Sequence, residues 1–255
     1  MNSVFSEYSK FYNQFYANKK YSDECKKIIE LMSQFDGKSE KKKILEIGCG
    51  TGNYSKYLYR NSKALLAIDK STEMINIAKK NNRNFEDSFI DISLTEFLNS
   101  NVNNNFDVII LLFHVLTYFT DEELFNLKRI VDSNLNKNGY LIFDYWESEG
   151  VVKKPPETTI KEIEINAIEI LERVATPSFV SENRVDVRFD FFLVNKNQAK
   201  KVKLFDEYHI MYPRSKKYLE NYFALGEPLI SYDLAENEEY SGKNYGNLLM
   251  FKKKN

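Results

Sequence analysis

The stretch KILEIGCGTGNY, residues 43 to 54, decides how the rest of the chain is interpreted. Its apolar start carries one acid, Glu46, and it ends in three alternating glycines: Gly48, Gly50 and Gly52. Glycines between a strand and a helix let the backbone turn sharply and approach a ligand that any Cβ would meet. A dinucleotide-binding loop has the spacing Gly-x-Gly-x-x-Gly, but its third glycine would fall at Asn53. The stretch predicts a ligand-binding strand-turn-helix unit with a different spacing.

Length, net charge and cysteine count limit the classes of function that the chain can have. The 255 residues can bury a large core, and 36 basic against 37 acidic residues leave a net charge of −1. The absence of a basic stripe argues against nucleic acid as a partner. Only two cysteines are present, which argues against a metal cluster and a disulfide framework. No apolar run is long enough for a membrane span, and the polar, aromatic N-terminus lacks the apolar region of a signal peptide. We expect a cytoplasmic protein, without a metal, that acts on a small molecule.

Further strands follow, and acids stand at their ends. Residues 64 to 68 are apolar and end at Asp69, after which Ser71 is placed to cap a helix. A carboxylate at the end of a second strand suits a ribose diol, because it can accept hydrogen bonds from both hydroxyls. Residues 106 to 113, FDVIILLF, read as a parallel strand covered on both faces. The pattern predicts an α/β fold with a doubly wound, Rossmann-like sheet.

The spacing Glu-x-Gly-x-Gly-x-Gly, followed by Asp69 and a helix entered through Ser71, resembles the first two motifs of class I S-adenosylmethionine-dependent methyltransferases. The resemblance implies a seven-stranded methyltransferase sheet, S-adenosylmethionine as cofactor and S-adenosylhomocysteine as product. In this family the glycine turn packs against the methionine and ribose of the cofactor, and an acid after the third strand binds the adenine. The implied cofactor-binding residues are Glu46, Gly48, Cys49, Gly50, Asn53, Asp69, Lys70, Met74, Asp91, Ile92, Leu112 and Phe113.

The N-terminal segment, predicted to be helical over residues 3 to 34, also resembles this family. Small-molecule methyltransferases of the class carry an arm of the form Tyr-x-x-x-Tyr-Asp-x-x-Tyr-x-x-x-x-Tyr, in which a tyrosine reaches the cofactor carboxylate. The chain has Asn13 in place of the usual Asp. Four tyrosines match the form: Tyr8, Tyr12, Tyr16 and Tyr21. The resemblance implies a cofactor contact by Tyr8, Tyr16 or Tyr21, while a core-facing aromatic stripe is the alternative.

Catalytic chemistry is expected where the fourth strand ends. The carboxyl ends of central parallel strands face the active-site crevice, so His114 and Tyr118 are predicted to border the transferred methyl group. The other histidine is His209, and Glu207 would share a strand face with it. A hydroxyl acceptor benefits from such a base, whereas an amine acceptor needs only to be unprotonated. These four residues are the candidate catalytic groups, and structural histidines are the alternative. A substrate wall is predicted from three aromatic residues: Tyr145, Trp146 and Tyr245.

The character of the chain changes after Gly150, where three stretches rich in β-branched and aromatic residues follow. They cover residues 158–175, 184–194 and 201–212. They predict an antiparallel β cap, residues 151–212, over the substrate crevice. The cap is inserted between an arm and cofactor-binding core, residues 1–150, and a last helix with a final hairpin, residues 213–255.

The cap also carries a resemblance. Phe205-x-Glu207-x-His209-x-Met211 and Arg173-Val-Ala-Thr-Pro are similar to segments of bacterial methyltransferases found with sugar and surface-glycan biosynthesis. That branch has Tyr-Gly-Pro where this chain has Glu147-Ser148-Glu149. The resemblance implies methyl transfer to a hydroxyl or amine of a small polar acceptor, such as an activated sugar for a capsule or surface polysaccharide. An NAD-dependent oxidoreductase, or a methyltransferase-like protein that only binds its cofactor, is the alternative. A homodimer is also compatible with the sequence.

Overall fold

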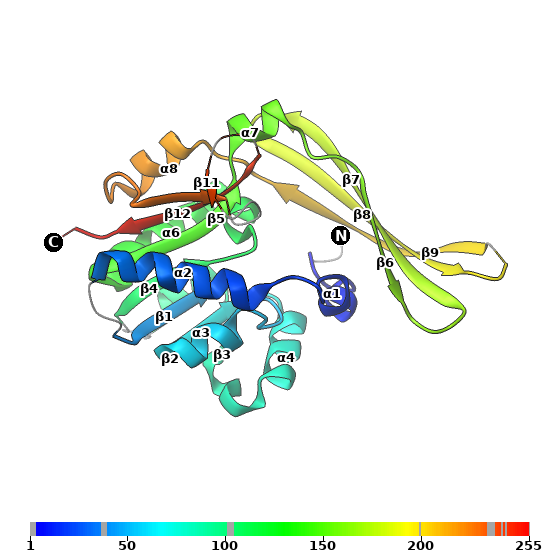
Figure 1. The fold of residues 1–255 in the computed structure, drawn as a ribbon, viewed down its shortest axis with the longest axis horizontal. Helices are drawn as coiled ribbons and strands as arrows, with labels where there is room; N and C mark the ends of the chain where they lie inside the picture. Colours follow the sequence, from blue (N-terminus) through cyan, green and yellow to red (C-terminus); the bar gives the residue numbers. More distant parts are fainter. Residues whose placement is uncertain are drawn as a thin grey trace.

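Two β-sheets, helices on both faces of the larger sheet and a short N-terminal helix build the molecule (Figure 1). The computed structural model describes residues 4–36, 40–100, 105–198, 200–233, 238–240, 242 and 244–254. Within these residues the larger sheet has eight strands in the order β11-β10-β12-β5-β4-β1-β2-β3, and the smaller sheet has four in the order β6-β7-β8-β9. The expected α/β class with an inserted antiparallel sheet is confirmed.

The larger sheet is parallel through five strands and antiparallel at one edge. The parallel strands are β3 (Phe89–Asp91), β2 (Ser62–Asp69), β1 (Lys42–Ile47), β4 (Phe106–Leu111) and β5 (Leu135–Trp146). The antiparallel strands are β12 (Gly246–Lys252), β10 (Ile230–Asp233) and β11 (Glu238–Glu239). Seven of these strands correspond to the expected sheet, and the eighth, β11, is too short to carry a periodic signal. The strand order reverses between β1 and β4, and this is where ligands bind in doubly wound sheets.

Three helices cover each face of this sheet. One layer consists of α2 (Tyr21–Asp36), α3 (Ser55–Asn61) and α4 (Thr72–Asn81), and the other of α5 (Leu94–Asn99), α6 (Asp121–Asn134) and α8 (Lys216–Phe223). Successive strand residues point to opposite faces. In β1, Leu45 and Ile47 therefore pack with the second layer, whereas Ile44 packs with the first. Burial on both faces explains why the central strands are apolar throughout.

The smaller sheet, called the cap below, is antiparallel. Its strands are β6 (Thr159–Glu164), β7 (Glu169–Ser181), β8 (Arg184–Asn195) and β9 (Lys200–Met211). The helix α7 (Ser148–Lys153) leads into it, and α1 (Ser9–Phe15) lies beneath it, beside the core (Figure 1). Residues 4–20 are called the arm, and the face of the cap toward the arm is its inner face. Tyr8 and Phe15 pack there against Leu171 and Phe191.

The structure corrects two predicted elements. The single helix over residues 3 to 34 is wrong, because α1 packs on the cap while α2 packs on the core sheet, and the chain turns between them. The first cap stretch is not one strand but two, since Asn166 Oδ1 accepts hydrogen bonds from the amides of Ile168 and Glu169, each at 2.9 Å, and closes a turn. Leu234, within the segment predicted to hold the final hairpin, lies outside the described residues.

Candidate active site

A cavity of about 1100 Å³ opens between the carboxyl ends of the core strands and the cap. Its floor is formed by the loops that follow β1, β2, β3 and β4, and its roof by the arm and β9. Fourteen predicted site residues contribute to its wall: Tyr21, Gly48, Cys49, Gly50, Asn53, Asp69, Lys70, Met74, Ile92, Leu112, Phe113, Tyr118, Glu207 and His209. The topology thus brings together residues far apart in the sequence.

The glycine turn is held against the end of β2. The amides of Gly48 and Cys49 both donate to the carbonyl oxygen of Ile68, at 2.8 and 3.0 Å. Gly48 has φ +70, and a Cβ there would lie 2.5 Å from Val115 Cγ1. At Gly50, with φ +54, a Cβ would meet no atom within 4 Å, since the residue faces the cavity. The turn leaves its backbone open to a bound molecule, as the sequence predicts.

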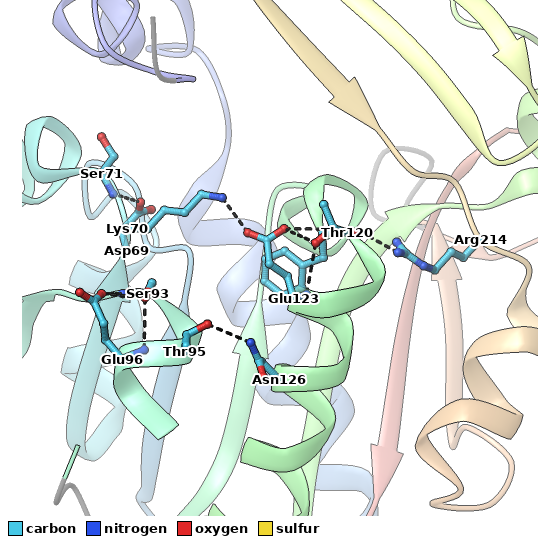
Figure 2. Close-up of polar contacts among 11 residues, drawn as sticks. Asp69, Lys70, Ser71, Ser93, Thr95, Glu96, Thr120, Glu123, Asn126 and Arg214 are labelled. Atoms are coloured by element: carbon cyan, nitrogen blue, oxygen red, sulfur yellow. Dashed lines mark hydrogen bonds and ion pairs between the residues drawn. The ribbon is translucent and has the colours of Figure 1, made fainter. Parts of the chain in front are cut away.

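Asp69 is positioned by two backbone amides. The amide of Gly50 donates to Asp69 Oδ2 and that of Ser71 to Oδ1, each at 2.9 Å. Burial raises the pKa of Asp69, while these two hydrogen bonds oppose the rise. Each oxygen keeps a further lone pair for a ligand hydroxyl. Figure 2 shows Lys70 reaching from the same loop to Glu123 of α6, with Nζ 2.7 Å from Oε1. This ion pair bridges one rim of the cavity.

The arm is anchored to the glycine turn through Asn13. Its Oδ1 accepts from Thr51 Oγ1 at 2.6 Å and from Asn53 Nδ2 at 2.9 Å. An amide oxygen can therefore hold the arm where related arms carry a carboxylate. Tyr21, along with Tyr12, lines the cavity, whereas Tyr8 and Tyr16 turn toward the cap. The sequence pattern did not identify Asn13 or Thr51 as anchors. Their positions, within the arm motif and within the glycine turn, were the available indication.

Besides Tyr8 and Tyr16, two expected cofactor residues lie outside the cavity wall. Glu46 is 2% exposed and accepts from Ser55 Oγ at 2.6 Å, behind the glycine turn. Burial raises its pKa to about 8, and the nearby Asp69 adds to the rise. Asp91 ends β3 with an exposed side chain, and the residues that follow it, Ile92 to Thr95, line the cavity instead. Asp91 pairs with Asp69 across the ends of β2 and β3, beside this wall, and its adenine contact stays a prediction.

Glu207, His209 and Tyr118 form a hydrogen-bonded series in the roof. His209 Nδ1 lies 3.0 Å from Tyr118 Oη, and His209 Nε2 lies 3.2 Å from Glu207 Oε2. Burial lowers the pKa of His209, although Glu207 opposes this. With Glu207 ionised, Nε2 carries the hydrogen and Nδ1 accepts from the phenol. The three side chains, from η2 (Val115–Tyr118) and β9, all line the cavity.

Glu207 also holds the arm in place. Its two oxygens accept from the amides of Phe5, at 2.9 Å, and Tyr8, at 3.0 Å. Burial raises the pKa of Glu207, but hydrogen bonds from His209 and these amides outweigh it and leave the pKa lowered. The Phe5 ring packs on His209 of this hydrogen-bonded series, with the two ring centroids 4.9 Å apart.

Acidification is expected to loosen this arrangement. A carboxylate with a lowered pKa contributes stability above its unfolded pKa of about 4.3, and this is lost as the pH falls through the folded value. The lowered pKa of His209 adds acid sensitivity below about pH 6.5, because His209 is protonated at higher pH in the unfolded chain than in the folded one.

Glu207→Gln should lower the free energy of unfolding by about 1–3 kcal/mol at pH 7 and flatten the acid limb of thermal stability. Glu164→Gln, which removes an exposed cap ion pair, is the control and should change little. An unchanged acid limb in Glu207→Gln would contradict the assignment.

Four other predicted residues lie outside the wall of the cavity: His114, Tyr145, Trp146 and Tyr245. His114 turns toward Asp144, with Nδ1 3.3 Å from Oδ2, and its amide donates to the same carboxylate at 2.8 Å. Trp146 and Tyr245 pack on each other, with centroids 4.8 Å apart, in a small core beneath the cap. Tyr145 is buried and accepts from Asn247 at 3.3 Å. The expected aromatic wall is instead provided by Tyr12, Phe113, Tyr118 and Tyr208.

Metal ligands are not grouped at this site. Among the described residues no three His, Cys, Asp or Glu side chains are arranged to hold a metal ion. Across the same part of the chain, no helix has the length and apolar character needed to cross a membrane.

Comparisons with known proteins agree with this geometry. Residues 44–139 match the family model described as methyltransferase domain, and no curated protein matches the chain. An S-adenosylmethionine-dependent methyltransferase from Clostridium acetobutylicum is 19% identical, with a TM-score of 0.71 over 99% of this chain and 100% of that one. A sugar N-methyltransferase from Streptoalloteichus is 15% identical, with a TM-score of 0.74 over 96% and 93%. An amino pentose methyltransferase from Micromonospora echinaspora is 13% identical, with a TM-score of 0.73 over 99% of both chains.

The matched segment runs from β1 into β5 and thus contains the glycine turn, Asp69 and the loop after β4. The structural likeness extends over nearly the whole chain, cap included. Residues 44–139 are therefore similar to a methyltransferase domain, and the chain as a whole shares the fold of the S-adenosylmethionine-dependent methyltransferases to which it is compared.

Proposed function

We propose that this protein transfers the methyl group of S-adenosylmethionine to a hydroxyl or amine of a small polar acceptor. The observation that carries the proposal is one cavity that joins an open glycine turn and a fixed carboxylate, Asp69, to the buried series of Glu207, His209 and Tyr118. The first two suit a nucleoside cofactor, and the series suits an acceptor that must lose a proton.

The donor half of the cavity fits this cofactor. Gly50 presents backbone without a neighbour, and Asp69 offers two oriented oxygens to the ribose hydroxyls. Bound S-adenosylmethionine supplies a methyl group that is already activated on a sulfonium. The protein then has to align the acceptor and exclude water. The aromatic rings of Tyr12, Tyr21 and Phe113 line the wall nearby, and aromatic faces tolerate positive charge without competing as nucleophiles.

In the acceptor half, Tyr118 and His209 would receive the proton of a hydroxyl acceptor. The lowered pKa keeps His209 neutral near pH 7, so that Nδ1 can accept the phenol hydrogen as Tyr118 Oη takes one from the acceptor. Glu207 would orient the ring and stabilise the imidazolium, as the acid of a catalytic triad does. An amine acceptor would need this series only for positioning.

The acceptor that we favour is an activated sugar used for a bacterial surface polysaccharide, handled in the cytoplasm. Two observations support this choice: the cap motifs around Arg173 and Glu207 resemble those of sugar-modifying methyltransferases, and two of the similar folds are described as a sugar N-methyltransferase and an amino pentose methyltransferase. A screen of amino and hydroxyl sugar nucleotides for formation of S-adenosylhomocysteine tests the choice.

Cofactor binding is tested by calorimetric titration. S-adenosylmethionine and S-adenosylhomocysteine should bind and NAD should not. Asp69→Asn should weaken both by about tenfold to hundredfold, because the neutral amide gives up a charge-assisted bond to the diol. Glu164→Gln, on the exposed cap strand β6 and outside the cavity wall, is the control and should leave binding unchanged. Binding of NAD without either sulfur compound would overturn the proposed donor.

A further inference from the structure

A second pocket, of about 500 Å³, lies between the arm and the first strand of the cap. It is lined by Tyr16, Asn18 and Lys19 on one side and by Lys161 and Glu162 on the other. Phe113 contributes to its wall and to that of the main cavity, so the two spaces are neighbours. None of the groups discussed for the donor, the glycine turn and Asp69, borders this pocket.

Two cations lie beside the pocket, the exposed Lys161 and the buried Arg173, and the acidic Glu162 also lines it. Lys161 of β6 stands directly opposite Arg173 of β7 in the antiparallel pairing. Like charges at opposite positions destabilise a sheet. Arg173 is only 3% exposed, its Nε has no hydrogen-bond partner, and among the described residues neither cation is within ion-pair distance of a carboxylate. A buried guanidinium without a counter-charge is costly, so an arrangement that retains it indicates an anion from outside the chain.

The hydrogen bonds around Arg173 direct one donor toward the pocket. Arg173 Nη1 donates to the hydroxyls of Tyr8 and Tyr16, the latter at 3.0 Å, and Tyr8 Oη donates to Tyr16 Oη at 3.3 Å. Tyr16 thus accepts twice, and no described residue accepts its own hydroxyl hydrogen. Burial alone would raise the pKa of Tyr16. The charges of Arg173 and Lys161 and the hydrogen bonds from Arg173 and Tyr8 outweigh burial and leave this pKa lowered. A phenol in this state is a strong donor to an anion.

We infer that this pocket binds an oxyanion, a phosphate group of the acceptor, through the Tyr16 hydroxyl and the Lys161 ammonium, with Arg173 positioning Tyr16 from behind. Lys161 Nζ lies 4.4 Å above the Tyr16 ring centroid, so both groups can reach one ligand. Lys19 already forms an ion pair with Glu24 at 2.5 Å and contributes less charge. The assignment rests on the proposed function, since it gives the acceptor of that reaction an anionic group.

The test uses inorganic phosphate and pyrophosphate as probes on the full chain, with chloride at equal ionic strength as reference. Dissociation constants are measured with and without saturating S-adenosylhomocysteine. Tyr16→Phe and Lys161→Gln should each weaken pyrophosphate binding by about tenfold, because each removes one charge-assisted hydrogen bond. Both variants should bind S-adenosylhomocysteine like the wild type. Lys201→Gln, on the exposed part of β9, is the matched control and should bind pyrophosphate normally.

Three outcomes would overturn the inference. The first is equal pyrophosphate binding in the wild type and both variants. The second is loss of pyrophosphate binding in Lys201→Gln as well, which indicates only general charge attraction. The third is weakened S-adenosylhomocysteine binding in both variants, while 5′-methylthioadenosine, which lacks the amino-acid portion, binds as before. That result would assign the pocket to the cofactor carboxylate. Failure of the wild type to bind S-adenosylhomocysteine at all would instead sink the proposed function.

Discussion

Gly48→Ala is expected to destabilise the protein by about 2–4 kcal/mol and to weaken cofactor binding at least tenfold. Two costs combine at this position. The backbone has φ +70, where a side chain adds about 1–3 kcal/mol of strain, and the new Cβ would lie 2.5 Å from a methyl group of Val115. Overpacking of this kind costs about 1–3 kcal/mol. Relief by moving Val115 would disturb the wall of the cavity that this residue lines.

Gly50→Ala separates the two costs. It has the same kind of backbone, φ +54, but no atom within 4 Å of the added Cβ. It should lose less stability than Gly48→Ala and still lose cofactor affinity, because the methyl group would enter the cavity. Adding Val115→Ala to Gly48→Ala should recover about 1–2 kcal/mol. Chemical denaturation of the four proteins measures these differences. Equal stability of the two alanine variants would show that the Val115 contact is not a source of strain.

His209→Asn is expected to lower kcat by about 10²–10⁴-fold for a hydroxyl acceptor, the range that general base catalysis supplies. In the wild type, kcat should fall on the acid side below about pH 6.5, since the lowered pKa of His209 delays its protonation. The variant should lose this limb of the profile while binding S-adenosylhomocysteine normally. Glu207 would keep its two arm amides but lose the bond to His209, which should also cost about 1–3 kcal/mol of stability.

Tyr118→Phe is the companion variant. It keeps the ring in the cavity wall and removes only the hydroxyl that lies 3.0 Å from His209. If the proton passes through the phenol, Tyr118→Phe should lower kcat as His209→Asn does, and the double variant should add little. A pH profile that follows only the ionisation of an amine acceptor, with kcat retained in both single variants, would remove the base assignment.

Much of the donor half could be predicted from local sequence. The glycine turn, Asp69 with its following N-cap, and the apolar β4 are contiguous signals, and strand topology alone brings their ends together. The capping box of α5, formed by Ser93 and Glu96, is a similar local signal, because it has the sequence form Ser-x-x-Glu. Glu207 and His209 were paired correctly because alternate residues of a strand share a face.

The acceptor half could not be predicted to the same depth, because its residues meet only through packing between distant segments. Trp146 and Tyr245 follow the expected pattern for a crevice wall, yet the cap folds over them and buries them in its own small core. His114 stands at the end of β4, but its backbone, with φ +64, turns the ring away toward Asp144. The break between α1 and α2 has the same origin, since each helix packs on a different sheet.

Glu207 links the arm to the series of Glu207, His209 and Tyr118, since it accepts hydrogen bonds from two arm amides and from His209. Seating of the arm buries His209 beneath Phe5 and engages the carboxylate with other donors, and both effects disfavour the imidazolium. Thermodynamic reciprocity then requires the converse: proton release from His209 must favour a seated arm by the same factor. Closing of the arm over the ligands and deprotonation of His209 are therefore thermodynamically coupled, so that each favours the other.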